Sequence, residues 1–480
     1  MATVAERMLG KKGRLVTALA ALVLAPAARA GGPGMVIGAT EDAVRSPTLV
    51  GATAEMTLAA LAGFRGVRIS QAWAPGETAV SDSDAAEIRN VTAAAQLSGM
   101  EVVASVLNAG SSTTPLSAQD QADFAAYAAS IVTADPDLTR VIVGNEPNLN
   151  RYWLPQFNAD GSDAAAPAYE SLLATTYDAI KAVAPGVTVI GGAVSPRGGD
   201  VPGTIRDTHS PTVFITDLGA AYRASGRTIP IMDAFAFHPY EDNSSIPPAA
   251  GAHPNTTTIA LADYGKLVGL LATAFDGTAQ LGSTLPIYYD EFGVESLIPA
   301  SKQSAYTGTE PATTKPVDEA TQALFYRQAI ELAFCQPNVQ GLFLFHVFDE
   351  TALAGWQSGP YYADGTPKSS LPAIRLAMEE SRRGVVAACP GMQLTPKAHI
   401  TQRAAVLTLS CDLDCAYIAQ LYRLPGKLLT SKRGRAVGGR PAALPLRVPT
   451  ARASYRLRIS LTAPVNPGPP MLLRVPVRPG

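Results

Sequence analysis

Eight short apolar segments alternate with longer amphipathic segments between residues 35 and 380, and this alternation constrains the fold more than any other feature. The apolar segments are rich in Val, Ile and Phe, as parallel strands buried on both faces are. They are Met35–Gly38, Val67–Ile69, Val102–Leu107, Val141–Gly144, Val187–Ile190, Ala234–Phe237, Ile287–Tyr289 and Leu342–Phe345. Eight successive strand–helix units predict an α/β fold, a (β/α)8 TIM barrel.

The segments between these strands have helical periodicity. Helices are predicted at Glu55–Ala62, Ala85–Leu97, Ala118–Val132 and Tyr169–Val183, and near 212–224, 259–275, 318–334 and 371–381. A doubly wound open sheet is the alternative, but no glycine-rich dinucleotide fingerprint follows the first strand. Of the 480 residues, 47% are hydrophobic and only 16% are charged, which excludes a disordered chain.

The pattern changes after Cys389. Strands are predicted at Ala405–Cys411, Ala416–Leu421, Leu444–Val448, Tyr455–Leu461 and Met471–Val477, separated by Gly and Pro clusters. In the fourth of these, apolar residues alternate with Arg456, Arg458 and Ser460, which is typical of a strand buried on one face. A small all-β sandwich of about 90 residues is therefore predicted.

Charge marks the same boundary. Residues 31–389 carry 19 Lys and Arg against 37 Asp and Glu, whereas residues 390–480 carry 14 against 2. We expect a barrel domain at 31–388 and a basic accessory domain at 389–480. The basic domain either grips anionic polymers or docks on the acidic barrel. The whole chain has a formal net charge of −2, which gives no reason to expect nucleic-acid binding.

Residues 1–30 have the pattern of a secretory signal peptide. Lys11, Lys12 and Arg14 precede an apolar run, and Ala28-Arg29-Ala30 is a small-x-small cleavage site. An uncleaved anchor is the alternative, although the apolar run is too short to span a bilayer. We expect a secreted, extracellular protein with no membrane segment after cleavage.

Four cysteines fit an oxidising compartment, and four allow three disulfide pairings. We expect Cys335 to pair with Cys389 and Cys411 with Cys415. No metal is expected, because no C-x2-C pair or nearby His accompanies them.

Two carboxylates follow two well-separated strands of the predicted barrel. The fourth strand ends in Asn145-Glu146-Pro147, and the seventh is followed by Asp290-Glu291-Phe292-Gly293. Chemistry in such barrels lies at the carboxyl ends of the strands. A retaining glycosidase needs two carboxyl groups there, one that donates a proton and one that attacks the anomeric carbon.

These motifs resemble clan A of the glycoside hydrolases, the cellulase-like (β/α)8 enzymes, and families five and thirty-nine most of all. The resemblance implies that Glu146 is the acid/base, Glu291 the nucleophile and Asn145 the partner of the sugar 2-hydroxyl. It also implies that Arg68 keeps the nucleophile ionised. His238 and Tyr240 resemble the His and Tyr that border the nucleophile.

The resemblance is incomplete at the eighth strand. Clan A enzymes commonly place a Trp there as a sugar platform, whereas this chain has Phe345-His346-Val347-Phe348. Phe348 or Trp356 is the candidate replacement. Trp153 and its neighbour Tyr152 are further candidates for stacking on sugar rings or, alternatively, for packing in the loop. Asn108 ends the third strand and is a candidate substrate contact.

Each remaining candidate has a structural alternative. His238 either contacts the substrate or fixes the Pro239 turn. Arg68 either keeps Glu291 ionised or neutralises the acidic open end of the barrel. Asp290 and Glu295 are expected to be supporting or facing solvent. No serine-hydrolase elbow, phosphate loop or zinc-protease motif is present.

The sequence therefore predicts a secreted, monomeric retaining glycoside hydrolase that acts on an oligo- or polysaccharide without a cofactor. The alternative is a non-catalytic carbohydrate-binding barrel attached to cell-wall or extracellular glycans.

Overall fold

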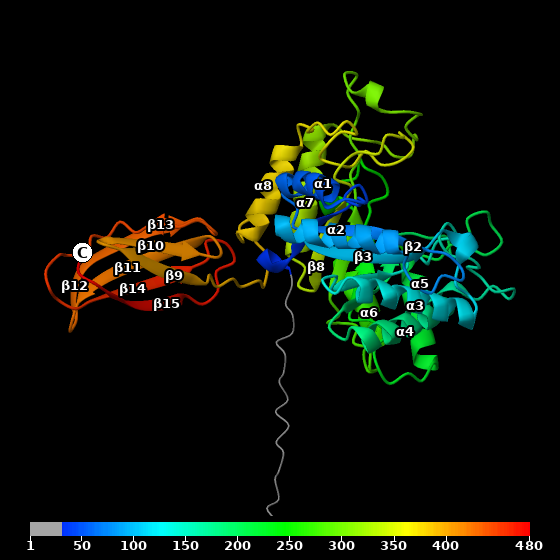
Figure 1. Cartoon of the computed structure of the whole chain (residues 1–480), viewed down its shortest axis with the longest axis horizontal. Helices are drawn as coiled ribbons and strands as arrows, with labels where there is room; N and C mark the ends of the chain where they lie inside the picture. Colours follow the sequence, from blue (N-terminus) through cyan, green and yellow to red (C-terminus); the bar gives the residue numbers. More distant parts are fainter. Residues whose placement is uncertain (1–30) are drawn as a thin grey trace, which may run out of the picture.

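The computed structural model describes residues 31–480, so the predicted signal peptide lies outside the described residues. Eight parallel strands form a closed barrel in sequence order, as predicted (Figure 1). The strands are β1 (Val36–Thr40), β2 (Gly66–Trp73), β3 (Glu101–Asn108), β4 (Arg140–Val143), β5 (Thr188–Val194), β6 (Ala234–Phe237), β7 (Ile287–Phe292) and β8 (Val339–Phe345).

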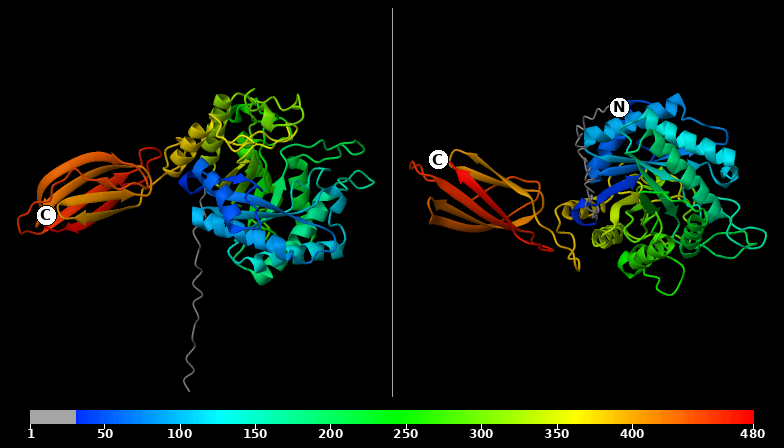
Figure 2. Two further views of the ribbon diagram at one scale, coloured as in Figure 1. Left: turned by 45° about the horizontal axis from the view of Figure 1, so that its top comes forward. Right: turned by 90° about the horizontal axis from the view of Figure 1, so that it is seen from below.

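A ring of helices surrounds the barrel (Figure 2). They are α1 (Leu49–Ala62), α2 (Asp82–Ser98), α3 (Ala118–Ala134), α4 (Ala165–Val183), α5 (Pro211–Ala224), α6 (Tyr264–Phe275), α7 (Glu319–Phe334) and α8 (Leu371–Arg382). Short 3₁₀ turns lie at η1 (Gly32–Gly34), η2 (Ser111–Thr113), η3 (Pro248–Ala250), η4 (Leu261–Asp263) and η5 (Gln303–Ala305). Helix α1 begins six residues before its predicted start, because the Thr48 side chain caps it by accepting a hydrogen bond from the Gly51 amide.

The inside of the barrel is filled by side chains from the strands β3 to β8. A cluster of buried residues occupies it: Val103, Ile142, Ile190, Ala193, Ala234, Ala236, Tyr288 and Phe343. The Phe343 ring fits only because glycines face it. A Cβ on Gly38 would lie 2.5 Å from that ring, and one on Gly341 would lie 2.8 Å from it. The barrel is thus a packed core, and its open end is built by the loops that follow the strands.

The carboxyl-terminal region is a two-sheet sandwich with its own buried core, as predicted. One sheet has the order β13-β10-β9 and the other β12-β11-β14-β15. The strands are β9 (Ala398–Arg403), β10 (Val406–Cys411), β11 (Cys415–Arg423), β12 (Lys427–Ala436), β13 (Ala442–Ala443), β14 (Tyr455–Thr462) and β15 (Met471–Val477).

Two details of the predicted sandwich are wrong. The segment Leu444–Val448 is not a strand, although its alternate residues Leu444, Leu446 and Val448 are buried in the sandwich core. The strands β9 and β12 were not predicted, because both lie at sheet edges and neither contains a run of alternating apolar residues.

The sandwich is attached at the amino-terminal end of the barrel strands. Cys335 ends α7 just before β8 begins, and it forms a disulfide with Cys389. Arg383 makes two 2.9 Å hydrogen bonds to the Asp414 carboxylate across the junction. Figures 1 and 2 show the sandwich standing beside the barrel rather than covering the loops at its open end.

Both predicted disulfides are present, Cys335–Cys389 and Cys411–Cys415. We expect peptide mapping under non-reducing conditions to recover these two links. The first closes a separation of 54 residues, so replacing Cys335 and Cys389 with Ser should lower the free energy of unfolding by about 4 kcal/mol. Urea denaturation of the double variant measures this loss. Four free thiols in the purified protein would contradict the pairing.

Candidate active site

Six of the predicted site residues converge at the carboxyl ends of the barrel strands. Arg68 belongs to β2, Glu291 to β7, and the others directly follow β4 and β6: Asn145, Glu146, His238 and Tyr240. Arg68, His238 and Tyr240 are buried, and the two glutamates are each reached by solvent over a small part of the side chain. The barrel therefore brings together residues from positions 68 to 291 of the chain.

Glu291 is held by three neighbours. Its Oε1 lies 3.1 Å from Nη1 of Arg68, and its Oε2 accepts a hydrogen bond of 3.1 Å from the Tyr240 hydroxyl. The Nδ1 atom of His238 lies 3.4 Å from the same Oε2. Both carboxylate oxygens thus face donors, which fixes the orientation of the group.

Glu146 has an unusual backbone conformation, with a φ of 41°. The left-handed region costs a non-glycine residue about 1–2 kcal/mol, and such residues cluster at functional sites. The Glu146 amide donates a 2.8 Å hydrogen bond to the Ala193 carbonyl in β5. Its Oε1 lies 3.0 Å from Nδ1 of His238. The strained backbone aims this side chain at the histidine that also contacts Glu291.

The loop after Glu146 is anchored by buried amides that sequence reasoning missed. Asn148 accepts a hydrogen bond from the Ser195 amide (2.9 Å) and donates one to the His209 carbonyl (2.9 Å). Gln156 donates to the Pro147 carbonyl (3.0 Å). Both side chains are fully buried. In the sequence, the one sign of this role for Asn148 was its position two residues after Glu146.

Asp290 is the third acid of the site and was expected to be a supporting or solvent-facing residue. Its side chain is buried, with Oδ2 3.3 Å from Nε2 of His238 and 3.7 Å from Nε of Arg68. Successive residues of a regular strand point to opposite faces. Here the register of β7 and β8 shifts between Tyr289 and Phe292. This irregularity lets Asp290 and Glu291 face the same two cations.

The charges of the cluster set its protonation. Burial alone would lower the pKa of His238, but the carboxylates of Glu291 and Asp290 raise that pKa well above its usual value. Burial raises the pKa of Glu291, although His238 and Arg68 act against this effect. Burial and the nearby Glu291 carboxylate raise the pKa of the Tyr240 hydroxyl, which therefore remains a hydrogen-bond donor. These charges favour the protonated form of His238, which with Arg68 faces the three acids of the site.

An aromatic group lies beside Glu291. The Trp356 ring lies 4.8 Å from the Tyr240 ring and 5.3 Å from the Phe345 ring, measured between centroids. Gly293 makes room for it, because a Cβ there would lie 3.1 Å from the Trp356 ring. Phe348 packs on Tyr361 instead, with centroids 5.6 Å apart. Trp356 rather than Phe348 therefore joins the aromatic group at the mouth.

Trp153 and Asn108 lie away from this cluster. Trp153 is 1% exposed and packs edge-to-face on Tyr169 of α4, so it belongs to the hydrophobic core. Its neighbour Tyr152 is partly exposed, and burial and the nearby Glu146 raise its pKa to about 12. Asn108 is buried and donates 2.8 Å hydrogen bonds to the carbonyls of Gly110 and Tyr152. Asn108 thus positions the segment that carries Tyr152.

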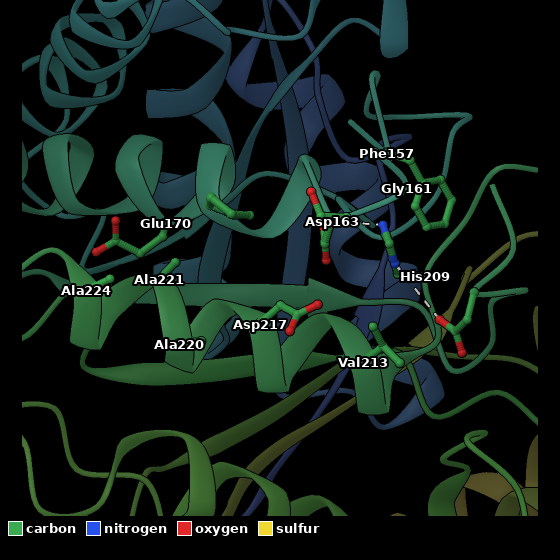
Figure 3. Close-up of a pocket in the computed structure, with 13 residues that line it drawn as sticks. Phe157, Gly161, Asp163, Glu170, His209, Val213, Asp217, Ala220, Ala221 and Ala224 are labelled. Atoms are coloured by element: carbon green, nitrogen blue, oxygen red, sulfur yellow. Dashed lines mark ion pairs between the residues drawn. The ribbon is translucent and has the colours of Figure 1, made fainter. Parts of the chain in front are cut away.

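A separate cavity of about 770 Å³ lies between α4 and α5 (Figure 3). His209 lies at its edge, with Nε2 3.3 Å from Asp163 and 2.8 Å from the Gln156 carbonyl. Burial raises the pKa of Asp163 to about 6. Neither Glu146 nor Glu291 lines this cavity. Its polar groups support the loop behind Glu146 and form no part of the mouth.

Within residues 31–480, no helix has the length and apolar character needed to cross a bilayer. Within the same residues, no group of three or more His, Cys, Asp or Glu side chains is arranged to hold a metal ion.

Comparison with protein-family models gives no match, and comparison with curated proteins gives none either. Among solved structures, GH5_18 from Streptomyces cattleya, a point variant in complex with Manb1-4GlcNAc, is 16% identical with a TM-score of 0.51 over 75% of this chain and 84% of that one. A glucosidase from Croceicoccus marinus is 11% identical with a TM-score of 0.50 over 88% and 94%. These likenesses show a shared barrel fold.

The chain spans under half the length of another similar structure. The β-glucuronidase of Bacteroides uniformis is 12% identical with a TM-score of 0.44, and the match covers 93% of this chain but 46% of that one.

We predict that the folded protein holds the pKa of His238 well above its usual value. In 13C-histidine NMR spectra, the titration midpoint of its ring signals should lie well above the unfolded value of about 6.5, because the carboxylates of Glu291 and Asp290 stabilise the protonated ring. The His238→Gln variant assigns the signals among the five histidines of the chain. His238 then stabilises the fold fully below about pH 6.5, and this contribution falls as the pH rises toward the folded pKa. A midpoint at or below 6.5 would contradict the prediction.

Proposed function

We propose that this protein is a secreted retaining glycoside hydrolase of clan A that cleaves O-glycosidic bonds in an oligo- or polysaccharide. The observation that carries the proposal is the joint contact of Glu146 and Glu291 with one atom, Nδ1 of His238, at the carboxyl ends of two barrel strands. The likeness in fold to glycoside hydrolases supports it by analogy. The two disulfides suit an oxidising compartment and support secretion.

The spacing of the two carboxyl groups favours retention of configuration. Oε1 of Glu146 and Oε2 of Glu291 lie 3.0 and 3.4 Å from the same nitrogen. These two oxygens are thus at most about 6.4 Å apart, whereas inverting enzymes separate the groups by ~6.5–9.5 Å to admit a water. The pair therefore suits direct attack by one carboxylate.

In the proposed mechanism, Glu146 protonates the glycosidic oxygen as the bond to the leaving group breaks. The Glu291 carboxylate attacks the anomeric carbon and forms a glycosyl ester. Glu146, now ionised, removes a proton from water, and the resulting hydroxyl displaces Glu291 from the sugar. Atoms and charges balance over the two steps, and no cofactor takes part.

The neighbouring groups fit these roles. Arg68 and His238 favour the anionic form of Glu291 against the effect of burial, and Tyr240 fixes its second oxygen. The side-chain Oδ1 of Asn145 accepts a 3.0 Å hydrogen bond from Nη2 of Arg68, which leaves the side-chain NH₂ group to bind the sugar 2-hydroxyl. Trp356, Phe345 and Tyr240 supply apolar faces for a sugar ring.

We expect Glu291→Gln to abolish turnover of aryl glycosides while sugar binding persists. Glu146→Gln should slow substrates with poor leaving groups by about 10²–10⁴-fold and activated aryl glycosides far less, because good leaving groups need little protonation. Steady-state kinetics on a panel of aryl glycosides measures both effects.

Glu241→Gln is the matched control. Glu241 follows Tyr240 in the chain, and burial raises the pKa of its carboxyl to about 9, so the neutral amide preserves its charge state at pH 7. Equal losses on both substrate types for Glu146→Gln would contradict its assignment. Sugar binding without turnover of any glycoside by the wild-type protein would favour the non-catalytic barrel.

Trp356→Ala should weaken substrate binding. Loss of an aromatic face costs about 1–2 kcal/mol, so KM for an oligosaccharide should rise about tenfold with a smaller change in kcat. Phe348→Ala is the control, since Phe348 lies eight positions earlier and packs on Tyr361 instead of joining the aromatic group at the mouth. A similar KM for the Trp356→Ala and Phe348→Ala variants would contradict the assignment of Trp356 to the substrate site.

A further inference from the structure

The outer face of the four-stranded sheet in the sandwich is dominated by arginine. Alternate residues of β14 and β15 point away from the core, as their burial pattern shows. We call the exposed arginines of this sheet the arginine face. They are Arg433 and Arg435 on β12, Arg456 and Arg458 on β14, and Arg474 on β15.

The strand register places these positive charges side by side. Arg458 lies directly opposite Arg474 across the β14–β15 ladder, and Arg456 lies opposite Tyr422 across the β11–β14 ladder. Directly opposed side chains have Cβ atoms about 4.5–5.5 Å apart, and like charges at that distance destabilise a sheet. The arrangement therefore opposes folding and indicates a use in binding.

Counter-charges for these arginines are lacking. Residues 390–480 contain only two acids, Asp412 and Asp414, and Asp414 is bound to Arg383 of the barrel domain. In the part of the chain that the structure describes, no ion pair involves a residue of the arginine face. The face is thus available to an external polyanion.

One part of the face is hollowed. Arg456, Arg458 and Arg474 surround a depression of about 240 Å³ together with Tyr422 and the turn at 424–426. Guanidinium groups bind carboxylates through two parallel hydrogen bonds, and a tyrosine ring offers a flat surface to a sugar. The depression suits an acidic sugar unit.

We propose that the arginine face binds a linear polysaccharide that carries carboxylate groups and so anchors the enzyme to it. The choice of a polysaccharide rests on the proposed function, whereas the choice of a polyanion rests on the charges alone. Single-stranded nucleic acids are bound through several stacking aromatics, and this face offers only Tyr422. The sandwich joins the barrel at the end opposite Glu146 and Glu291, so an anchored chain leaves the mouth open.

The test uses the full chain and polygalacturonate as the probe, with neutral dextran as reference. We expect binding to polygalacturonate by affinity electrophoresis and calorimetry, weakening as salt rises. The variant Arg456→Gln/Arg458→Gln/Arg474→Gln should bind at least about tenfold more weakly, about 1.4 kcal/mol. Its melting temperature should equal or exceed that of the wild type, because the substitutions remove like charges that oppose folding. Its kinetics on soluble aryl glycosides should match the wild type.

The variant Arg403→Gln/Arg447→Gln/Arg452→Gln removes the same charge from exposed positions of the same domain outside the arginine face. Equal weakening in both variants would overturn the proposal, because net charge would then explain the binding. Equally tight binding of single-stranded DNA or of anionic phospholipid vesicles would also overturn it. Binding as expected in a protein without glycosidase activity would uphold the anchor and reject the proposed enzyme.

Discussion

Two cations hold three acids at the mouth of the barrel, and the rest of the site depends on this arrangement. Arg68 and His238 contact Asp290 and Glu291 from two sides, and His238 also reaches Glu146. Buried carboxylates without such partners would be strongly disfavoured. The strands β2, β6 and β7 therefore need a matched register, because β2 and β7 supply Arg68 and the two acids Asp290 and Glu291, and β6 carries His238 just beyond its end. Barrel closure provides that alignment.

The sequence predicts the barrel because its strands are buried on both faces and its helices are amphipathic. The same logic places Glu146 and Glu291 at strand ends, where polar residues interrupt apolar segments. Local irregularities are not visible in this pattern. The shifted register near Tyr289 and the left-handed conformation of Glu146 depend on contacts across the sheet. The shifted register brings Asp290 into the site, and the left-handed conformation directs Glu146 toward His238.

The errors have similar causes. Trp153 lies only a few residues after the Asn145-Glu146-Pro147 motif. However, its amide donates a hydrogen bond to the Leu149 carbonyl, and this turn directs the Trp153 ring toward α4. Only the partly exposed Tyr152 remains on the outer side. Strand β12 is mainly polar and basic because it lies at a sheet edge, so no apolar alternation reveals it. Position in the fold, rather than composition, determines both outcomes.

The shared nitrogen of His238 has a consequence for the proposed reaction. An N–H group carries one proton, and two carboxylates lie on its side of the ring. Before the first step Glu291 is the anion, and after it Glu291 is a neutral ester while Glu146 is the anion. The imidazolium therefore faces one negative charge from this pair at every stage. That charge lies on Glu291 before the first step and on Glu146 after it, while the imidazolium neither gains nor loses a proton. Because the total charge of the two carboxyl groups stays the same, His238 has to change only the direction of its hydrogen bond when Glu146 turns from proton donor to base.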